Sequence, residues 1–188
     1  MAENRDGKAK IVASILTEST EQMARAIRSS TDGADLVELR VDALRDPDLA
    51  QLRAFRDKPL VLTCRSPEEG GKFQGSEQER RAILRQALEL GFDYVDVEMS
   101  TWSPELRQIS TTSKIVLSRH DFEACPPDPG RIVEQGIELG ADLVKLATRT
   151  TSLFDALRIA DAGRVARERG VDFVPVAMGP SGISTRIL

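Results

Sequence analysis

The 188-residue chain is poor in several residue types, and each scarcity excludes a class of function. Aromatic residues make up only 4% of it, too few for the stacking platforms that hold single-stranded nucleic acid. Basic residues do not exceed acidic ones, and the net charge of -4 offers no basic surface to phosphates. We therefore expect no nucleic-acid partner.

Long apolar runs and cysteines are also scarce. No apolar run approaches the roughly 18 residues of a membrane span, and residues 1–10 lack the apolar core of a signal peptide. The two cysteines, Cys64 and Cys125, are too few and too poorly spaced for a metal site. We expect a cytoplasmic protein with free thiols, and no membrane partner.

What the chain does contain is an alternation of strand-like and helix-like segments. Hydrophobic residues at 40% and charged residues at 30% are typical of an ordinary globular domain. Short apolar runs predict seven strands, at 11–16, 35–41, 59–65, 92–98, 114–121, 142–148 and 171–178. Helical spacing between them predicts helices at 20–29, 46–55, 76–90, 103–109, 131–139 and 152–169, and the start of another at 183–188.

This alternation favours an α/β fold, and the polar residues indicate which one. No GxGxxG follows the first strand, so a dinucleotide-binding fold is not expected. Polar residues stand at the ends of many strands, which suits a TIM-type (β/α)8 barrel better than an open sheet. Because a complete barrel has eight strands and typically about 250 residues, we expect the last one and a half β/α units to be missing. Residues 1–10 are then a flexible tail and 11–188 a single, incomplete barrel domain.

Two residues stand out chemically. His120, the only histidine, follows the apolar run 115–117, as in a buried strand that ends in a functional group. Lys145 lies within the apolar segment 142–148. A charged lysine is costly to bury, so we expect either exposure of its amine or a lowered pKa. A strand lysine beside a strand histidine is suited to forming a Schiff base with a carbonyl compound.

Five motifs, read in order from about residue 10 to residue 188, resemble type I 3-dehydroquinate dehydratase. They are 38–42 (ELRVD), 63–71 (TCRSPEEGG), 118–122 (SRHDF), 142–145 (DLVK), and 178–179 (MG) with 184–188 (STRIL). The resemblance implies a barrel enzyme of the shikimate pathway that dehydrates 3-dehydroquinate to 3-dehydroshikimate. It implies a lysine Schiff base and no metal or cofactor.

The resemblance also implies roles for individual residues. Lys145 matches the imine-forming lysine and His120 the general acid/base. Arg186 matches the arginine that binds the substrate carboxylate. The remaining matches either contact substrate hydroxyls and organise the site (Glu38, Arg40 and Arg65) or support it (Glu69 beside the histidine, and Met178 over the ring).

The chemistry sets requirements on these groups. Lys145 must be neutral to attack a ketone, and an ordinary lysine has a pKa of about 10.4. We expect burial and nearby arginines to lower that pKa. Imidazole carries protons near neutral pH. Either Glu69 or Glu98 is suited to hold one ring nitrogen of His120 and set its tautomer.

Structural alternatives stay open for several residues. Glu38 is also suited to pair with Arg40 or Arg65, and Arg40 to form an ordinary surface pair with Asp42. Glu98 is a possible buried partner of Lys145. Cys64 is expected in the core rather than as a nucleophile.

Two other functions compete with the dehydratase. One is a barrel that only binds a ligand or partner, favoured because the family continues past residue 188 with an eighth strand and a loop bearing serine and glutamine. The other is a different lysine-dependent barrel enzyme, such as an aldolase, against which the 65–71 loop and Arg186 argue. The predicted partners are the small-molecule substrate and a possible second copy in a homodimer.

Overall fold

The structure, a computed structural model, describes residues 9–29 and 31–186, and only the backbone of residues 184 and 186. Most of the predicted tail thus lies outside the described residues. All seven predicted strands are confirmed to within two residues, and they form one parallel sheet in sequential order. The strands are β1 Val12–Leu16, β2 Leu36–Arg40, β3 Leu60–Thr63, β4 Tyr94–Glu98, β5 Lys114–Asp121, β6 Leu143–Arg149 and β7 Asp172–Met178.

Helical segments connect successive strands. The α-helices are α1 Thr20–Ser29, α2 Leu49–Arg53, α3 Glu77–Glu89, α4 Pro104–Ile109, α5 Pro129–Glu138, α6 Leu153–Asp161 and α7 Gly163–Glu168. Short 3-10 helices are η1 Val41–Ala43, η2 Pro67–Glu69, η3 Met99–Thr101 and η4 Pro180–Arg186. The residues predicted to start a helix at 183–188 lie instead in η4, as far as they are described.

Two helices show how the sequence sets their ends. Ser76 and Glu79 form a capping box at the start of α3, each satisfying a backbone N–H of the other. The predicted helix 152–169 is instead two helices, α6 and α7. Val165 donates to Ala162 only three residues back, which tightens the chain at the break. Gly163, a weak helix former, begins α7.

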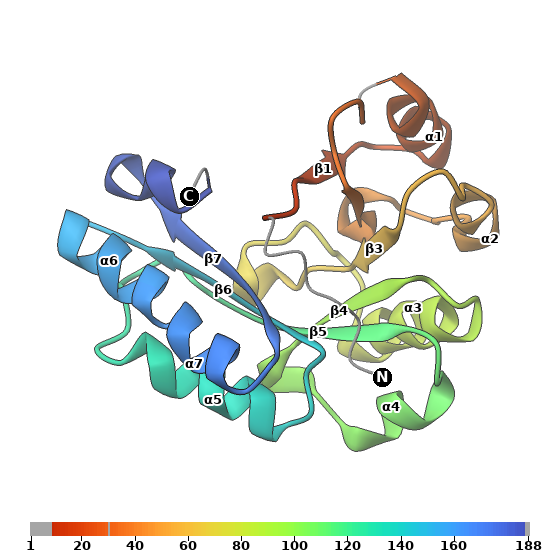
Figure 1. Ribbon diagram of the computed structural model, residues 1–188. Coiled ribbons are helices and arrows are strands. Elements are labelled where there is room, and N and C mark those ends of the chain that lie inside the picture. Colours follow the sequence, from red (N-terminus) through yellow and green to blue (C-terminus); the bar gives the residue numbers. More distant parts are fainter. Residues whose placement is uncertain (1–8, 30, 187–188) are drawn as a thin grey trace.

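The sheet is strongly curled. Lys145 on β6 lies 2.7 Å from Glu38 on β2, measured from Nζ to Oε1. In a flat sheet, strands four places apart are roughly 19 Å apart, farther than these two side chains can reach together. The α-helices cover the outer, convex face (Figure 1). The main core, with Leu39, Val97 and Leu117, lies between that face and the helices.

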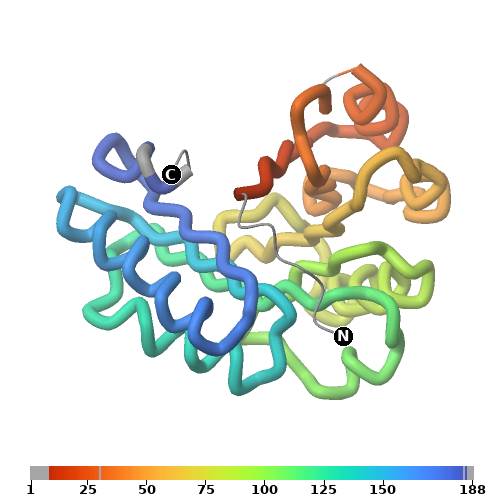
Figure 2. Tube along the Cα trace, in the orientation of Figure 1, coloured from red at the N-terminus to blue at the C-terminus, as the bar shows by residue number. Residues whose placement is uncertain are grey.

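β1 and β7 are the two edge strands of the described sheet. They lie at opposite ends of the arc, red and blue in Figures 1 and 2, and are not paired with each other. Val12 and Leu16 on β1 are exposed. The described fold is therefore a seven-stranded, curled parallel sheet with an open side between β7 and β1. No helix in the described residues is long and apolar enough to cross a membrane.

Candidate active site

The concave face of the sheet carries polar side chains because strand residues point alternately to the two faces. Leu36, Val61 and Val116 form a small apolar layer on this face. One step toward the carboxyl ends of the strands lie Glu38, Thr63, Asp96, Ser118 and Lys145, and beyond them Arg40, Glu98 and His120. Because the strands are parallel, their carboxyl ends meet at one edge, and the polar groups gather there.

Lys145 sits between two carboxylates. Its Nζ lies 2.7 Å from Glu38 and 3.3 Å from Asp96, and 18% of its side chain is exposed. Burial lowers the pKa of Lys145, but the charges of Asp96 and Glu38 more than offset this, so the pKa lies above its ordinary value. The predicted lowering is therefore wrong for the described state. The two carboxylates come from strands far away in the sequence and outweigh burial and Arg65 together.

Arg65, two residues after the end of β3, has the most polar contacts of any side chain described in the site. Its guanidinium contacts Asp96 at 2.7 Å, Ser118 at 2.8 Å, Glu98 at 3.3 Å and Glu69 at 3.5 Å. Only 3% of the side chain is exposed. The planar fork of an arginine suits such multiple contacts better than the single ammonium of a lysine. Arg65 therefore links β4, β5 and η2 at the centre of the site.

Asp96 is a site residue that the sequence analysis missed. Its Oδ2 accepts from Arg65 and Lys145, and its Oδ1 accepts from the Ser118 hydroxyl at 2.5 Å. Burial raises the pKa of Asp96, but the charges of Arg65 and Lys145 hold it well below its ordinary range. The available signal was its position: Asp96 stands two residues before Glu98, so both point to the same face.

Glu98 has a different partner from the one proposed. It accepts from the backbone N–H of Ser66 at 2.8 Å and pairs with Arg65 and Arg80. Arg80 reaches it from α3 and is almost fully buried. The suggestion that Glu98 pairs with Lys145 is wrong, because Asp96 occupies that place. Glu98 instead anchors the chain after β3 and brings a buried cation beneath the site.

His120 is held by Glu69, which resolves the choice left open between Glu69 and Glu98. The Glu69 Oε2 lies 2.8 Å from Nδ1 of His120 and accepts from the His120 backbone N–H at 3.0 Å. A carboxylate accepts only from a protonated nitrogen, so the neutral ring carries its proton on Nδ1. Nε2 then keeps a free lone pair, as a general base requires.

Arg40 and Asp42 form a bidentate pair at 2.8 and 2.9 Å. Asp42 is buried and also accepts from the backbone N–H of Lys72, so this is not an ordinary surface pair. The pair ties the end of β2 to the loop after η2. The suggested pairing of Glu38 with Arg40 or Arg65 is not found. Glu38 instead accepts hydrogen bonds from Lys145 and from the hydroxyl of Thr63.

The remaining predicted residues lie at the same edge or in the core. Met178 ends β7, and its carbonyl accepts from the backbone N–H and hydroxyl of Thr150, both at 2.8 Å. Arg186 ends η4, but its side chain lies outside the described part of the structure. Cys64 lies in the core as predicted, and burial raises the pKa of its thiol to about 12.

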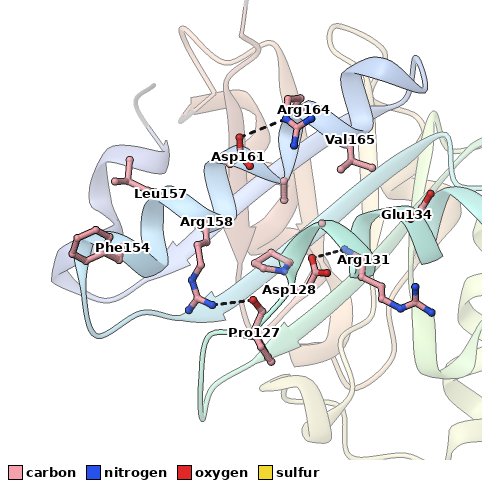
Figure 3. A pocket seen from close by; sticks show the side chains of 13 residues that line it. Pro127, Asp128, Arg131, Glu134, Phe154, Leu157, Arg158, Asp161, Arg164 and Val165 are labelled. Atoms are coloured by element: carbon pink, nitrogen blue, oxygen red, sulfur yellow. Dashed lines mark hydrogen bonds and ion pairs between the residues drawn. The ribbon is translucent and has the colours of Figure 1, made fainter.

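A separate groove of about 540 Å³ lies on the convex side, among α5, α6 and α7 (Figure 3). Its charged groups bond locally, as Arg158 does with Asp155 and the carbonyl of Pro127. None of the predicted site residues lines it. The chemistry predicted from the sequence therefore concerns the concave face and not this groove.

The acidic residues of the site make stability depend on pH. The pKa values of Asp96 and Glu38 lie below their ordinary values in the folded protein. Their stabilisation is therefore complete above the unfolded-state pKa values, near 4, and is lost as the pH falls. We expect the contribution of Asp96 to the free energy of unfolding to fall by about 1 kcal/mol at pH 3 and by about 2 kcal/mol at pH 2, relative to pH 7.

Urea denaturation at pH 7, 4, 3 and 2 measures this loss. The Asp96→Asn variant should be less stable at pH 7 but show a flatter dependence on acid. Asp161→Asn is the matched control, because its carboxylate is 72% exposed and far less enclosed. Equal acid dependence in the wild type and Asp96→Asn would contradict the assignment.

Comparison with known proteins places these observations in a family. A family model described as type I 3-dehydroquinase matches residues 11–188. A 3-dehydroquinate dehydratase of Methanosarcina mazei is 32% identical over 197 residues, covering 96% of this chain and 80% of that protein. A bifunctional 3-dehydroquinate dehydratase/shikimate dehydrogenase of Arabidopsis thaliana chloroplasts is 33% identical, over 95% of this chain.

The chain spans only part of some relatives. It covers 31% of the Arabidopsis protein and 59% of a 37% identical 3-dehydroquinate dehydratase of Methanothrix thermoacetophila. Among solved structures, the type I 3-dehydroquinate dehydratase of Clostridium difficile with covalently modified comenic acid has a TM-score of 0.83 and 26% identity. That match covers 96% of this chain and 79% of the other.

Proposed function

Because the chain belongs to the type I 3-dehydroquinase family, we propose that it dehydrates 3-dehydroquinate to 3-dehydroshikimate through an imine on Lys145. The observation that carries the proposal is the position of the Lys145 amine, 2.7 Å from Glu38 on the concave face. His120 stands on the neighbouring strand and belongs to the same face. The C. difficile relative, with its covalently modified ligand, supports covalent chemistry in this fold.

Lys145 must lose a proton before it attacks the ketone. Glu38, its nearest carboxylate, accepts that proton from Nζ. The amine then adds to the ketone carbon, and loss of water gives a cationic iminium. This cation takes the place of the ammonium between Glu38 and Asp96, so the carboxylates that raise the lysine pKa also stabilise the intermediate.

His120 moves the protons of the elimination. With its proton on Nδ1 held by Glu69, the Nε2 lone pair removes the proton next to the iminium carbon and leaves an enamine. The protonated ring then returns a proton to the departing hydroxyl group. Water finally hydrolyses the conjugated iminium, which releases the enone product and restores the Lys145 amine.

The proposed substrate contacts divide according to which donors remain free. Arg40 gives Nε and Nη2 to Asp42, which leaves Nη1 available for a substrate hydroxyl. Arg65 is surrounded by protein acceptors, so we assign it to organising the site. Arg186 binds the substrate carboxylate and Met178 packs over the ring in this proposal.

We further propose that the curled sheet is an arc of an eight-stranded barrel that closes between β7 and β1.

A second candidate function is a barrel that binds the ligand without turning it over. The observation that favours it is the exposure of Val12 and Leu16 on β1, because an open side admits water. Water weakens the electrostatic interactions on which the imine depends.

Borohydride trapping tests the proposal. The protein is incubated with 3-dehydroquinate, reduced, digested and examined by mass spectrometry. We expect an adduct on Lys145 and, before reduction, absorbance of the conjugated enone product. Binding with neither adduct nor enone would support the ligand-binding barrel, and no adduct at saturating substrate would overturn the imine mechanism.

A further inference from the structure

Phe122, directly after β5, is a large apolar side chain that stays 46% exposed at the rim of the site. Its ring lies against Gly70. A Cβ added to Gly70 would come within 2.4 Å of Cζ and 2.6 Å of Cε2 of that ring. Real Cβ atoms almost never make contacts this close, so the ring packs directly against the glycine backbone.

Gly70 is the residue that follows Glu69. It ends η2 in the left-handed conformation, with φ of 77°. The turn is held locally by backbone hydrogen bonds, including Gly70 to Pro67 at 3.1 Å and Gly71 to Ser66 at 2.7 Å. A single 3-10 turn is weakly stable by itself. The placement of the Glu69 carboxylate therefore depends on its contact with Arg65 and on what β5 packs against the turn.

β5 supplies that packing through two residues. His120 binds the Glu69 carboxylate, and Phe122, two positions later, covers the next residue of the turn. The chain beyond Phe122 is fixed as well, because Asp121 Oδ1 accepts from the N–H groups of residues 123 and 124 at 2.9 and 3.0 Å. The backbone that carries the ring is thus held by hydrogen bonds on both sides.

We propose that Phe122 is a positioning residue that holds the η2 turn against β5 and so keeps the Glu69 carboxylate on Nδ1 of His120. Without the ring, the turn loses its apolar contact and the carboxylate moves away from the imidazole. The effect on turnover rests on the proposed function, but the effect on the histidine does not. A misplacement of about 1 Å at a catalytic group can cost 10²-fold in rate.

The ring nitrogens of His120 report this directly, since the chain contains no other histidine. We would record ¹⁵N NMR shifts of the neutral ring, with Glu69→Gln as the reference for a lost carboxylate. Wild type should show the proton on Nδ1. Phe122→Ala should move at least half of the way to the Glu69→Gln shifts and lower kcat roughly 10- to 100-fold.

Two further variants make the test selective. Phe122→Leu keeps part of the apolar contact and should lie between wild type and Phe122→Ala. It also serves if Phe122→Ala fails to fold. Phe154→Ala on α6 removes another exposed phenylalanine, outside the site, and should leave both the shifts and kcat unchanged.

The two proposals fail in distinguishable ways. If Phe122→Ala and Phe122→Leu keep wild-type ¹⁵N shifts, the positioning role is wrong, whatever the outcome of trapping. If the shifts move but Lys145 is never trapped, the positioning role stands and the imine mechanism falls. In the Glu69→Gln background, Phe122→Ala should add little further loss of kcat, and a full additional loss would also overturn the role.

Discussion

Replacing Lys145 with arginine is expected to lower kcat for dehydration by at least about 10⁴-fold, because the covalent step is lost. Arginine keeps a positive charge near Glu38 and Asp96, so the buried carboxylates are not left without a cation. The side chain cannot form the imine. Steady-state formation of the enone and borohydride trapping together measure the loss.

The control is a lysine on the neighbouring strand. Lys114, exposed at the start of β5, becomes arginine in the matched variant, which should keep wild-type kcat and trapping. Circular dichroism and thermal unfolding verify that the Lys145→Arg protein is folded. A Lys145→Arg protein with more than about a tenth of wild-type kcat would show that the amine does not carry the reaction.

Replacing Arg65 with methionine is expected to lower the free energy of unfolding by about 3–5 kcal/mol. Methionine fills much of the same volume but leaves Asp96, Glu98 and Glu69 without their shared partner. Asp96 then keeps only Lys145 as a cationic partner and Glu98 only Arg80. Buried carboxylates that lose part of their charge compensation are costly, and the cost exceeds what the apolar side chain returns. Urea denaturation measures the change as a lower midpoint.

The comparison is with an exposed arginine pair. Arg85 is 64% exposed and pairs with Glu89 on α3, so Arg85→Met should change stability by at most about 1 kcal/mol. Arg65→Lys keeps the charge with fewer donors, so it should fall between wild type and Arg65→Met. If Arg65→Met were no less stable than Arg85→Met, the buried network would not hold the site together.

These two variants separate the two tasks of one network. A chain of ion pairs leads from an outer helix to the centre of the site, through Arg80, Glu98 and Arg65. Asp96 extends this chain from Arg65 to Lys145. The pairs of Glu98 with the two arginines hold the strands and η2 in place. The pair of Asp96 with Lys145 sets the negative charge next to the amine. A change at Arg65 should therefore affect folding first, whereas a change at Lys145 should affect chemistry first.

Much of the fold could be predicted from local patterns. The seven strands follow from short apolar runs, and α3 follows from its capping box with Ser76 and Glu79. The break between α6 and α7 could not, because helical spacing continues across Ala162 while the hydrogen bonding tightens there. Local propensity predicts which segments become helical. It predicts less well where a helix is interrupted.

For the site, the residues were predicted better than their interaction partners. His120 lies against Glu69, and Lys145 lies against Glu38. Both pairs combine residues that are far apart in the sequence but belong to the quoted motifs. Their partners were assigned less well. Asp96 was missed. Ion pairs were expected between residues close in the sequence or simply between residues of opposite charge.

The sequence alone determined which side chains face the inside of the sheet, because a strand alternates its two faces every second residue. Only the tertiary structure decided which of them meet. The curl of the sheet brings β2 and β4 toward β6, so Glu38 and Asp96 lie next to Lys145 and reverse the expected direction of its pKa shift. Electrostatic energy falls off with distance in space, and that distance is set by the packing of the whole sheet rather than by position along the chain.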